Sequence, residues 1–218
     1  MRPHVIVSNA VSPNGSLTGY AVDYGVYYPH LLAYHPDAVL VGADTILAAP
    51  VTIPPEEPAD FGKRSERADE TRPWWVVVDS RGRLAHHLHF FRRMEYTRDI
   101  IVLVSETTPE GYIRYLQERD YEYLVAGSDR VDLGMAMDTL FGTYNIRTLV
   151  SDTGGTLVTV ILESGLVDEI SLIVTPVLSG ETEVLLYKPS SKKNIALKLK
   201  ECMAIRDGYV HLLYEIVR

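Results

Sequence analysis

The stretch "SDTGGTLVTVILESGLVDEI" (Ser151–Ile170) decides how the chain is expected to fold. An apolar run, "RTLV" (147–150), leads into it, and a helical pattern follows two adjacent glycines, Gly154 and Gly155. Glycine loses more conformational freedom on folding than other residues, so two adjacent glycines at a strand-to-helix junction indicate a structural or functional requirement there. Either the pair only makes a tight connection, or it lets a phosphate approach the backbone amides at the helix start.

The alternation of strand and helix extends over the rest of the chain. Apolar runs of strand length occur at 4–10, 38–42, 74–80, 100–105, 123–126, 148–151 and 169–178. Helical spacing predicts helices at 25–34, 110–119, 133–144 and 156–164. Strands that are buried on both faces and alternate with helices are typical of a parallel sheet. We therefore expect an α/β fold, a three-layer sandwich with a mixed, mostly parallel sheet in a single domain over residues 1–218.

The chain closes with two alternating stretches, 194–205 and 209–217, joined by Asp207-Gly208. Asp-Gly between such stretches is a strong hairpin signal, so we expect antiparallel strands at the end of the sheet. Cys202 lies in the first of these stretches, where we expect a small buried hydrophobic side chain rather than a nucleophile.

One segment interrupts the pattern. Residues 50–73 are rich in proline and charged side chains, and their apolar residues do not recur at helix or strand spacing. We interpret them as an excursion loop rather than a domain linker, because neither side of it holds a complete sheet. A loop of this length in a compact domain is usually a functional lid, a contact surface or a mobile segment.

Composition excludes several classes of function. The 21 basic and 29 acidic residues give a net charge of −8, which argues against a general binder of nucleic acid or of anionic membranes. The single cysteine provides no disulfide framework and favours a cytoplasmic location. No run approaches the roughly 18 apolar residues of a membrane span.

Common cofactor and metal motifs are absent from the sequence. It has no G-x-G-x-x-G after the first strand, no G-x-x-x-x-G-K-[ST], and no C-x-x-C or H-E-x-x-H. The run "HHLH" (86–89) lacks carboxylates or thiols at matching spacing, so we expect no metal there and interpret it as a solvated or cofactor-facing loop.

Polar residues instead gather where predicted strands end. "VGADT" (41–45) ends one strand, "VDSRGR" (78–83) ends the next, and the Gly-Gly motif follows a third. Ligands of open parallel sheets bind at the carboxyl ends of strands. Amides and hydroxyls there suit a pyrophosphate, and Arg81 and Arg83 suit a terminal phosphate.

At this point the sequence resembles a known family. "VIVSNAVSPNG", "DAVLVGADT", "WWVVVDSRGR", "VDL" (131–133), "SDTGGTL" and "GLVDEISLIVTPVLSG" follow the order and spacing of the RibD C-terminal domain, from residue 3 to the final hairpin. The resemblance implies a fold similar to that of dihydrofolate reductase. It also implies a homodimeric, NADPH-dependent reductase of the riboflavin pathway, which converts the ribosyl group of a phosphoribosylaminopyrimidine to a ribityl chain.

The resemblance and the strand ends together give the candidate site residues. Those expected around NADPH are Gly42, Thr45, Ser80, Arg81, Arg83, Leu84, His87, Val131, Asp152, Thr153, Gly154, Gly155 and Thr156. Asn9, Asn14 and Ser16 are expected on the substrate side. On this interpretation the glycines admit the cofactor, so Gly155→Val should abolish cofactor binding and leave the fold largely intact.

The sequence departs from the family on the substrate side. Where the family commonly has S-L-D-G-K, this chain has "SPNGS" (12–16), so Asn14 replaces an acid and Ser16 a lysine. "EGGG" has become "DTGG" (152–155), and the helix at 24–36 is aromatic where the family carries Arg or Lys. The sequence identifies no proton donor. Two alternatives stay open: a reductase of a pterin or another small heterocycle, and a nucleotide-binding module without turnover.

Overall fold

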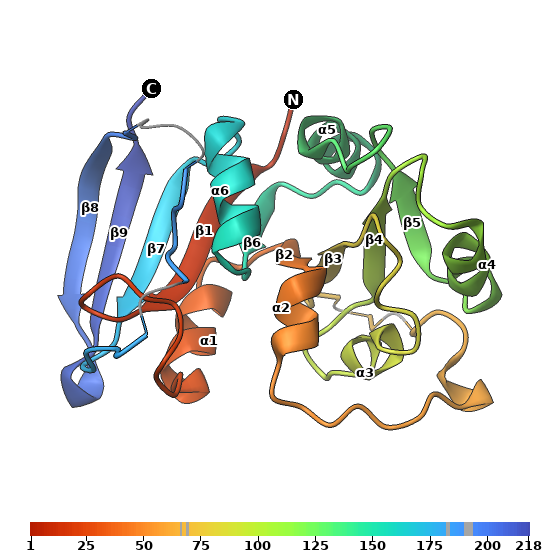
Figure 1. The fold of residues 1–218 in the computed structure, drawn as a ribbon, viewed down its shortest axis with the longest axis horizontal. Coiled ribbons are helices and arrows are strands. Elements are labelled where there is room, and N and C mark those ends of the chain that lie inside the picture. The colour runs from red at the N-terminus through yellow and green to blue at the C-terminus, as the bar shows by residue number, and fades with distance from the viewer. Residues whose placement is uncertain (66, 69, 182–183, 190–193) are drawn as a thin grey trace. The chain divides into compact units, whose positions relative to one another are not determined.

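The computed structural model describes residues 1–65, 67–68, 70–181, 184–189 and 194–218, and Figure 1 traces its elements. The chain forms two compact units. The first unit comprises Met1–Pro3 and Asp37–Arg147, and the second comprises His4–Pro36 and Thr148–Arg218. A single domain over 1–218 stays a prediction.

The first unit contains a parallel sheet of four strands in the order β5-β4-β3-β2. Its elements are β2 (Ala38–Gly42), α2 (Ala43–Ala48), β3 (Trp74–Val78), α3 (Leu88–Arg92), β4 (Ile100–Val104), α4 (Glu110–Glu118), β5 (Glu122–Val125) and α5 (Leu133–Thr143). Every residue of β2 and β4 is buried, as the continuous apolar runs predict for strands covered on both faces.

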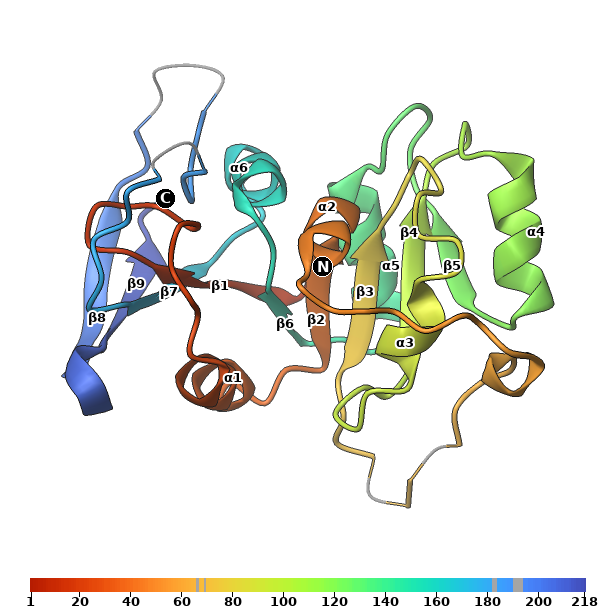
Figure 2. The ribbon, with the colours of Figure 1, turned by 60° about the horizontal axis from the view of Figure 1, so that its bottom comes forward.

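The second unit contains a mixed sheet in the order β6-β1-β7-β9-β8. Its elements are β1 (His4–Val11), α1 (Tyr24–Leu32), β6 (Thr148–Ser151), α6 (Gly155–Glu163), β7 (Glu169–Val174), β8 (Leu197–Ala204) and β9 (Val210–Ile216). β6, β1 and β7 run parallel, and β9 and β8 close the sheet antiparallel. Figure 2 shows α1 and α6 on opposite sides of this sheet.

The predicted fold class is confirmed: helices alternate with mostly parallel strands, and an antiparallel hairpin ends the chain. The strand predicted at 169–178 ends earlier, at Val174. The short helices α2 and α3 were not predicted, because a single helical turn carries too little periodicity to be recognised. No helix in the described part of the chain is long and apolar enough to cross a membrane.

The interpretation of "HHLH" as a loop is wrong for its second half. Leu88 and His89 begin α3, and the His89 side chain is buried, with Nε2 3.0 Å from the carbonyl oxygen of Pro54. Only His86 and His87 remain in the connection between β3 and α3.

The closing hairpin has one apolar and one charged face. Directly paired residues share a face, and the pairs Leu197–Ile216, Leu199–Tyr214 and Cys202–Leu212 form the apolar one. Yet every residue of β8 is exposed, so the expectation that Cys202 is buried is wrong. The alternation is present, but nothing in the described part of the chain covers the outer strand.

The excursion loop at 50–73 is held to the first unit by buried charge. The carboxylate of Glu56, only 4% exposed, accepts hydrogen bonds from Arg119 Nε at 2.7 Å and from the Tyr115 hydroxyl at 3.0 Å. Arg64 donates through one nitrogen to the carbonyl oxygens of Arg92, Met94 and Thr97 at 2.6–2.9 Å. Of the three expected roles, a mobile segment does not fit these anchored residues.

Arg92 is the centre of this network. Its guanidinium, 2% exposed, pairs with Asp99 at 2.8 Å and donates to the carbonyl oxygens of Gly62, Arg119 and Asp120 at 2.8–2.9 Å. It also lies 3.6 Å from the centre of the Tyr121 ring. Because four of its five donors are used and Asp99 neutralises it, the charge is buried at a tolerable cost.

Asp99→Asn should lower the free energy of unfolding by about 3–5 kcal/mol, because it leaves the Arg92 charge buried without its partner. Urea unfolding followed by circular dichroism measures the change. Lys63→Ala is the matched control: the Lys63–Glu122 pair is exposed, and its loss should cost at most about 1 kcal/mol. Equal effects of the two substitutions would contradict a central role for Arg92.

Candidate functional site

The turn that follows β3 is fixed by hydrogen bonds within the first unit. Buried Asp79 accepts from the backbone N–H of Leu84 at 2.9 Å, and the Gly82 N–H donates to the Asp79 carbonyl oxygen at 3.3 Å. Gly82 has φ = 66°, which favours glycine. Thr108 donates to the Ser80 carbonyl oxygen at 2.9 Å. The turn therefore presents its outward side chains in a defined arrangement.

Arg81 and Arg83 differ in their surroundings within this turn. Arg83 pairs with Asp44 of α2 at 2.7 Å. Arg81 is exposed and has neither a hydrogen bond nor an ion pair with any residue the structure describes. Arg81 is thus the cation of this turn that is available to an anionic ligand.

The other residues of the first unit that are expected around the cofactor differ in position and in exposure. Gly42 ends β2 and precedes α2, which contains Thr45. Leu84 is fully buried and its N–H is occupied by Asp79, so its side chain belongs to the core. Val131 is half-buried in the connection from β5 to α5.

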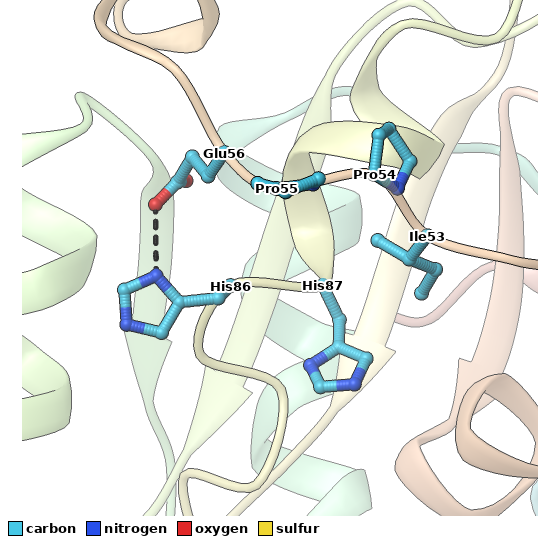
Figure 3. Close-up of a pocket in the computed structure, with 6 residues that line it drawn as sticks. All are labelled: Ile53, Pro54, Pro55, Glu56, His86 and His87. Carbon is cyan, nitrogen blue, oxygen red and sulfur yellow. Dashed lines mark hydrogen bonds and ion pairs between the residues drawn. The ribbon is translucent and has the colours of Figure 1, made fainter.

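A pocket of about 510 Å³ opens beside this turn, between the excursion loop and the start of α3. Figure 3 shows its lining by Ile53, Pro54, Pro55, Glu56, His86 and His87. His87 Nδ1 lies 2.8 Å from the Ala85 carbonyl oxygen, which only accepts, so this nitrogen carries a proton. His86 Nδ1 faces Glu56 at 3.1 Å in the same way. Both imidazoles therefore keep Nε2 for other partners.

In the second unit, Asn9 connects two neighbouring strand ends. Its side-chain amide donates to the Thr153 carbonyl oxygen at 2.9 Å. Its Oδ1 is buried and has no hydrogen-bond partner among the residues the structure describes. A buried acceptor without a partner is unfavourable, so this atom suits a donor supplied by a ligand.

Asp152 follows β6 and faces α1. Its Oδ1 lies 2.8 Å from the Tyr27 hydroxyl, and its Oδ2 lies 3.4 Å from the Tyr28 hydroxyl. Burial raises the pKa of Asp152 above its ordinary value, although its hydrogen bonds with the two tyrosine hydroxyls oppose the shift. The two tyrosine rings pack edge to face, with centroids 5.3 Å apart.

The structure corrects the explanation of Gly155. A Cβ at this position would point directly onto the carbonyl oxygen of Leu185, so the chain's own backbone fills the space expected for a cofactor. Neither Gly154 nor Gly155 has a positive φ, so no left-handed conformation is required. Gly154 still begins α6 without a side-chain cap, and Thr156 is exposed in its first turn.

Asn14 and Ser16 have structural partners. The Asn14 amide donates to the Ser179 carbonyl oxygen at 2.9 Å and accepts from the Ser179 N–H at 3.0 Å. Ser16 is buried, and its hydroxyl bonds to the backbone N–H and carbonyl oxygen of Thr18. The Asn14 bonds join the first loop to the segment after β7, and the Ser16 bonds stay within the loop. Both side chains are therefore engaged in loop structure.

A family model matches most of the chain. The model described as "RibD C-terminal domain" matches residues 23–211. The chain belongs to the RibD C-terminal domain family.

Relatives of known name support this assignment. The chain is 33% identical to the 2,5-diamino-6-ribosylamino-4(3H)-pyrimidinone 5′-phosphate reductase of Methanothermobacter thermautotrophicus, over 83% of this chain and 81% of the relative. It is 29% identical to the same-named protein of Archaeoglobus fulgidus, over 83% of each chain. The crystal structure of a pyrimidine reductase-like protein from Corynebacterium diphtheriae has the same fold, with a TM-score of 0.72 and 18% identity. It covers 99% of this chain and 92% of that one.

Each unit by itself contains a group that suits an anion. In the first unit Arg81 has no described partner, and in the second unit α6 begins without a side-chain cap. In the described part of the chain, no group of three or more His, Cys, Asp or Glu residues could hold a metal ion.

Sequence reasoning missed two residues that shape these sites. Asp79 was overlooked because an acid at a strand end looks like any capping residue, although it fixes the turn that carries Arg81. Tyr27 was seen only as part of an aromatic helix, and its contact with Asp152 spans 125 positions of sequence.

Gly155→Val should lower the free energy of unfolding by about 1–3 kcal/mol, because the new side chain must displace the Leu185 carbonyl group. Thermal unfolding and NADPH titration of the same variant separate this effect from ligand exclusion. Gly142→Ala, in the open part of α5, is the control and should be neutral or slightly stabilising. A variant with unchanged stability and no NADPH binding would restore the cofactor explanation.

Proposed function

We propose that this chain reduces the ribosyl group of a phosphorylated ribosylaminopyrimidine to a ribityl chain, as an NADPH-dependent reductase of the riboflavin pathway. The observation that carries the proposal is the 33% identity with a pyrimidinone 5′-phosphate reductase over 83% of this chain. The acidic net charge and the lone cysteine favour a small-molecule substrate, no nucleic acid and a cytoplasmic location.

Each unit offers a group that would suit a phosphate of the cofactor. In the first unit, the exposed Arg81 would pair with the terminal phosphate, since a guanidinium binds phosphate through two parallel hydrogen bonds. In the second unit, the start of α6 would favour negative charge. The cofactor would supply a hydride, and the protein would contribute position and exclusion of water.

The pocket at the excursion loop suits the adenine ring of such a dinucleotide. Ile53, Pro54 and Pro55 provide an apolar wall, and the Nε2 atoms of His86 and His87 provide acceptors for an amino group. The anchored excursion loop would then serve as a wall of the cofactor site rather than as a lid.

The altered first loop keeps two alternatives open. Asn14 and Ser16 are engaged in loop structure, so the protein offers no lysine there for a sugar phosphate. NADPH oxidation assayed with the diaminopyrimidine riboside phosphate and with reducible pterins distinguishes the substrates. Turnover of the pyrimidine alone supports the proposal; turnover of pterins alone favours the second reductase. NADPH binding without turnover of any substrate favours a binding module.

Arg81→Ala should weaken NADPH binding by roughly ten- to hundred-fold and leave NADH binding unchanged, because one charged hydrogen-bonded contact is lost. Fluorescence titration at low salt measures both dissociation constants. Arg83→Ala is the matched control: Arg83 already pairs with Asp44, so we expect a smaller effect. Equal affinity of the wild-type protein for NADPH and NADH would remove the argument for a phosphate-binding arginine.

The closing hairpin provides the surface for a homodimer. Leu197 and Leu199 of β8 are 42% and 52% exposed, on the same face as the apolar side chains of β9. An exposed edge strand with an apolar face is prone to pair or pack with another chain. A second copy, related by a two-fold axis, would cover this face with its own counterpart.

Light scattering at micromolar concentration should therefore give twice the chain mass of 24.5 kDa. Leu199→Lys should shift the protein to the monomer, because a charge would be buried in the interface. Met135→Lys, at an equally exposed apolar position of the first unit, should leave the dimer intact. A wild-type monomer under these conditions would rule out the dimer.

A further inference from the structure

The hydroxyl oxygen of Tyr27 lies between two other oxygen atoms. It is 2.8 Å from the Ser8 carbonyl oxygen and 2.8 Å from Asp152 Oδ1, and both distances are those of O–H···O hydrogen bonds. Two such bonds need two protons. The carbonyl has none and the phenol has one, so a proton on Asp152 would complete both bonds, whereas an ionised Asp152 would share the one phenol proton with the carbonyl.

The ionised alternative leaves one contact unmatched. If Asp152 were a carboxylate, the single Tyr27 proton would face two acceptors, and one pair of oxygen atoms would meet at 2.8 Å without a proton. Tyr27 is 4% exposed, so water has little access to its hydroxyl, while Asp152 is half-buried. An unmatched contact of this kind is costly in a buried site.

The surroundings of Asp152 within the second unit contain little charge. α1 contributes the hydroxyls of Tyr27 and Tyr28, and β1 contributes the Ser8 carbonyl and the Asn9 amide. α6 has no acidic or basic residue in its first turn, although the helix start itself favours an anion. Burial acts in the opposite direction and raises the pKa of Asp152.

We propose that Asp152 rests as a neutral carboxylic acid and donates the proton that the reduction requires, with Tyr27 and Tyr28 as positioning residues. The Asp152 proton points to the Tyr27 oxygen, and the Tyr27 proton points to the Ser8 carbonyl. The inference deepens the proposed function and rests on it for the substrate. In this proposal the aromatic residues of α1 position the acid, and they do not bind a phosphate.

The proton balance of the step is simple. The reduced nicotinamide would supply the hydride to the C1 carbon of the opened, imine form of the ribosylamine. As the C=N bond becomes a single bond, its electron pair takes the Asp152 proton, so an O–H bond breaks and an N–H bond forms. The resulting carboxylate then accepts a hydrogen bond from the Tyr27 hydroxyl, which keeps its proton, and one proton from solvent restores the acid.

Asn9 lies where it can orient the substrate for this transfer. β1 and β6 are parallel neighbours with Val7 opposite Ser151, so Asn9, still within β1, and Asp152, just after β6, both lie beyond this last pair. The unpartnered Asn9 Oδ1 would accept an N–H or O–H of the substrate. An acceptor and an acid together match a substrate rich in hydroxyl and amino groups.

The first test uses the protein without ligands. Infrared difference spectra at neutral pH, with the carboxyl carbons of aspartate isotopically labelled, should show a protonated carboxyl band that Asp152→Asn lacks. A spectrum with only ionised carboxylate bands would overturn the neutral acid. This measurement does not depend on turnover, so it decides the inference even if the proposed function fails.

The second test follows turnover as a function of pH. Asp152→Asn should lower kcat about 100- to 10,000-fold, the range for loss of a general acid. In the wild type, kcat should fall as pH rises through the pKa of the acid. Tyr27→Phe removes the acceptor of the acid's proton, so this fall should move to lower pH.

A shift of the Tyr27→Phe profile to higher pH would mean that Tyr27 donates to a carboxylate, and it would overturn the inference. Tyr24→Phe is the matched control, because the Tyr24 ring stacks on Tyr28 but its hydroxyl lies outside the network. Its profile should match that of the wild type. An equal change in Tyr24→Phe would show that packing of α1, not the proton arrangement, controls the rate.

Discussion

One buried guanidinium determines the irregular parts of the first unit. Arg92 has five donors and almost no access to water, so the backbone around it must supply acceptors. Asp99 neutralises its charge and takes one donor, and the carbonyl groups of Gly62, Arg119 and Asp120 take three more. The excursion loop and the turn between α4 and β5 therefore have few alternative positions, and the pocket beside His86 and His87 inherits that rigidity.

The strands could be predicted because residues that are buried on both faces of a sheet form continuous apolar runs in the sequence. β2 and β4 are apolar at every position, since both faces are covered. In the final hairpin, Asp207-Gly208 indicates the turn. Arg92 could not be recognised in the same way. An arginine after two phenylalanines looks like an ordinary surface cation, and its acceptors lie 7 to 30 positions away in the sequence.

The candidate site was predictable to the level of strand ends but not of individual contacts. Within each unit, parallel strands bring their carboxyl ends to one edge of the sheet, which is why the turn carrying Arg81 in the first unit and Asp152 in the second could be named. Which atoms are occupied depends on neighbours that sequence does not indicate. Arg83 is paired with Asp44, and Leu185 fills the space above Gly155. The glycine was correctly singled out for a close approach, but the approaching group is the chain's own backbone.

Cys202 gives the exposed face of the hairpin a further consequence. It is the single cysteine of the chain, it is exposed, and it pairs with Leu212 on the apolar face of β8. A thiol-reactive fluorophore or spin label would therefore attach at one defined position without prior engineering of the sequence. The native protein thus carries a ready attachment point for spectroscopy. A label there would report on any molecule that contacts the exposed apolar face of β8.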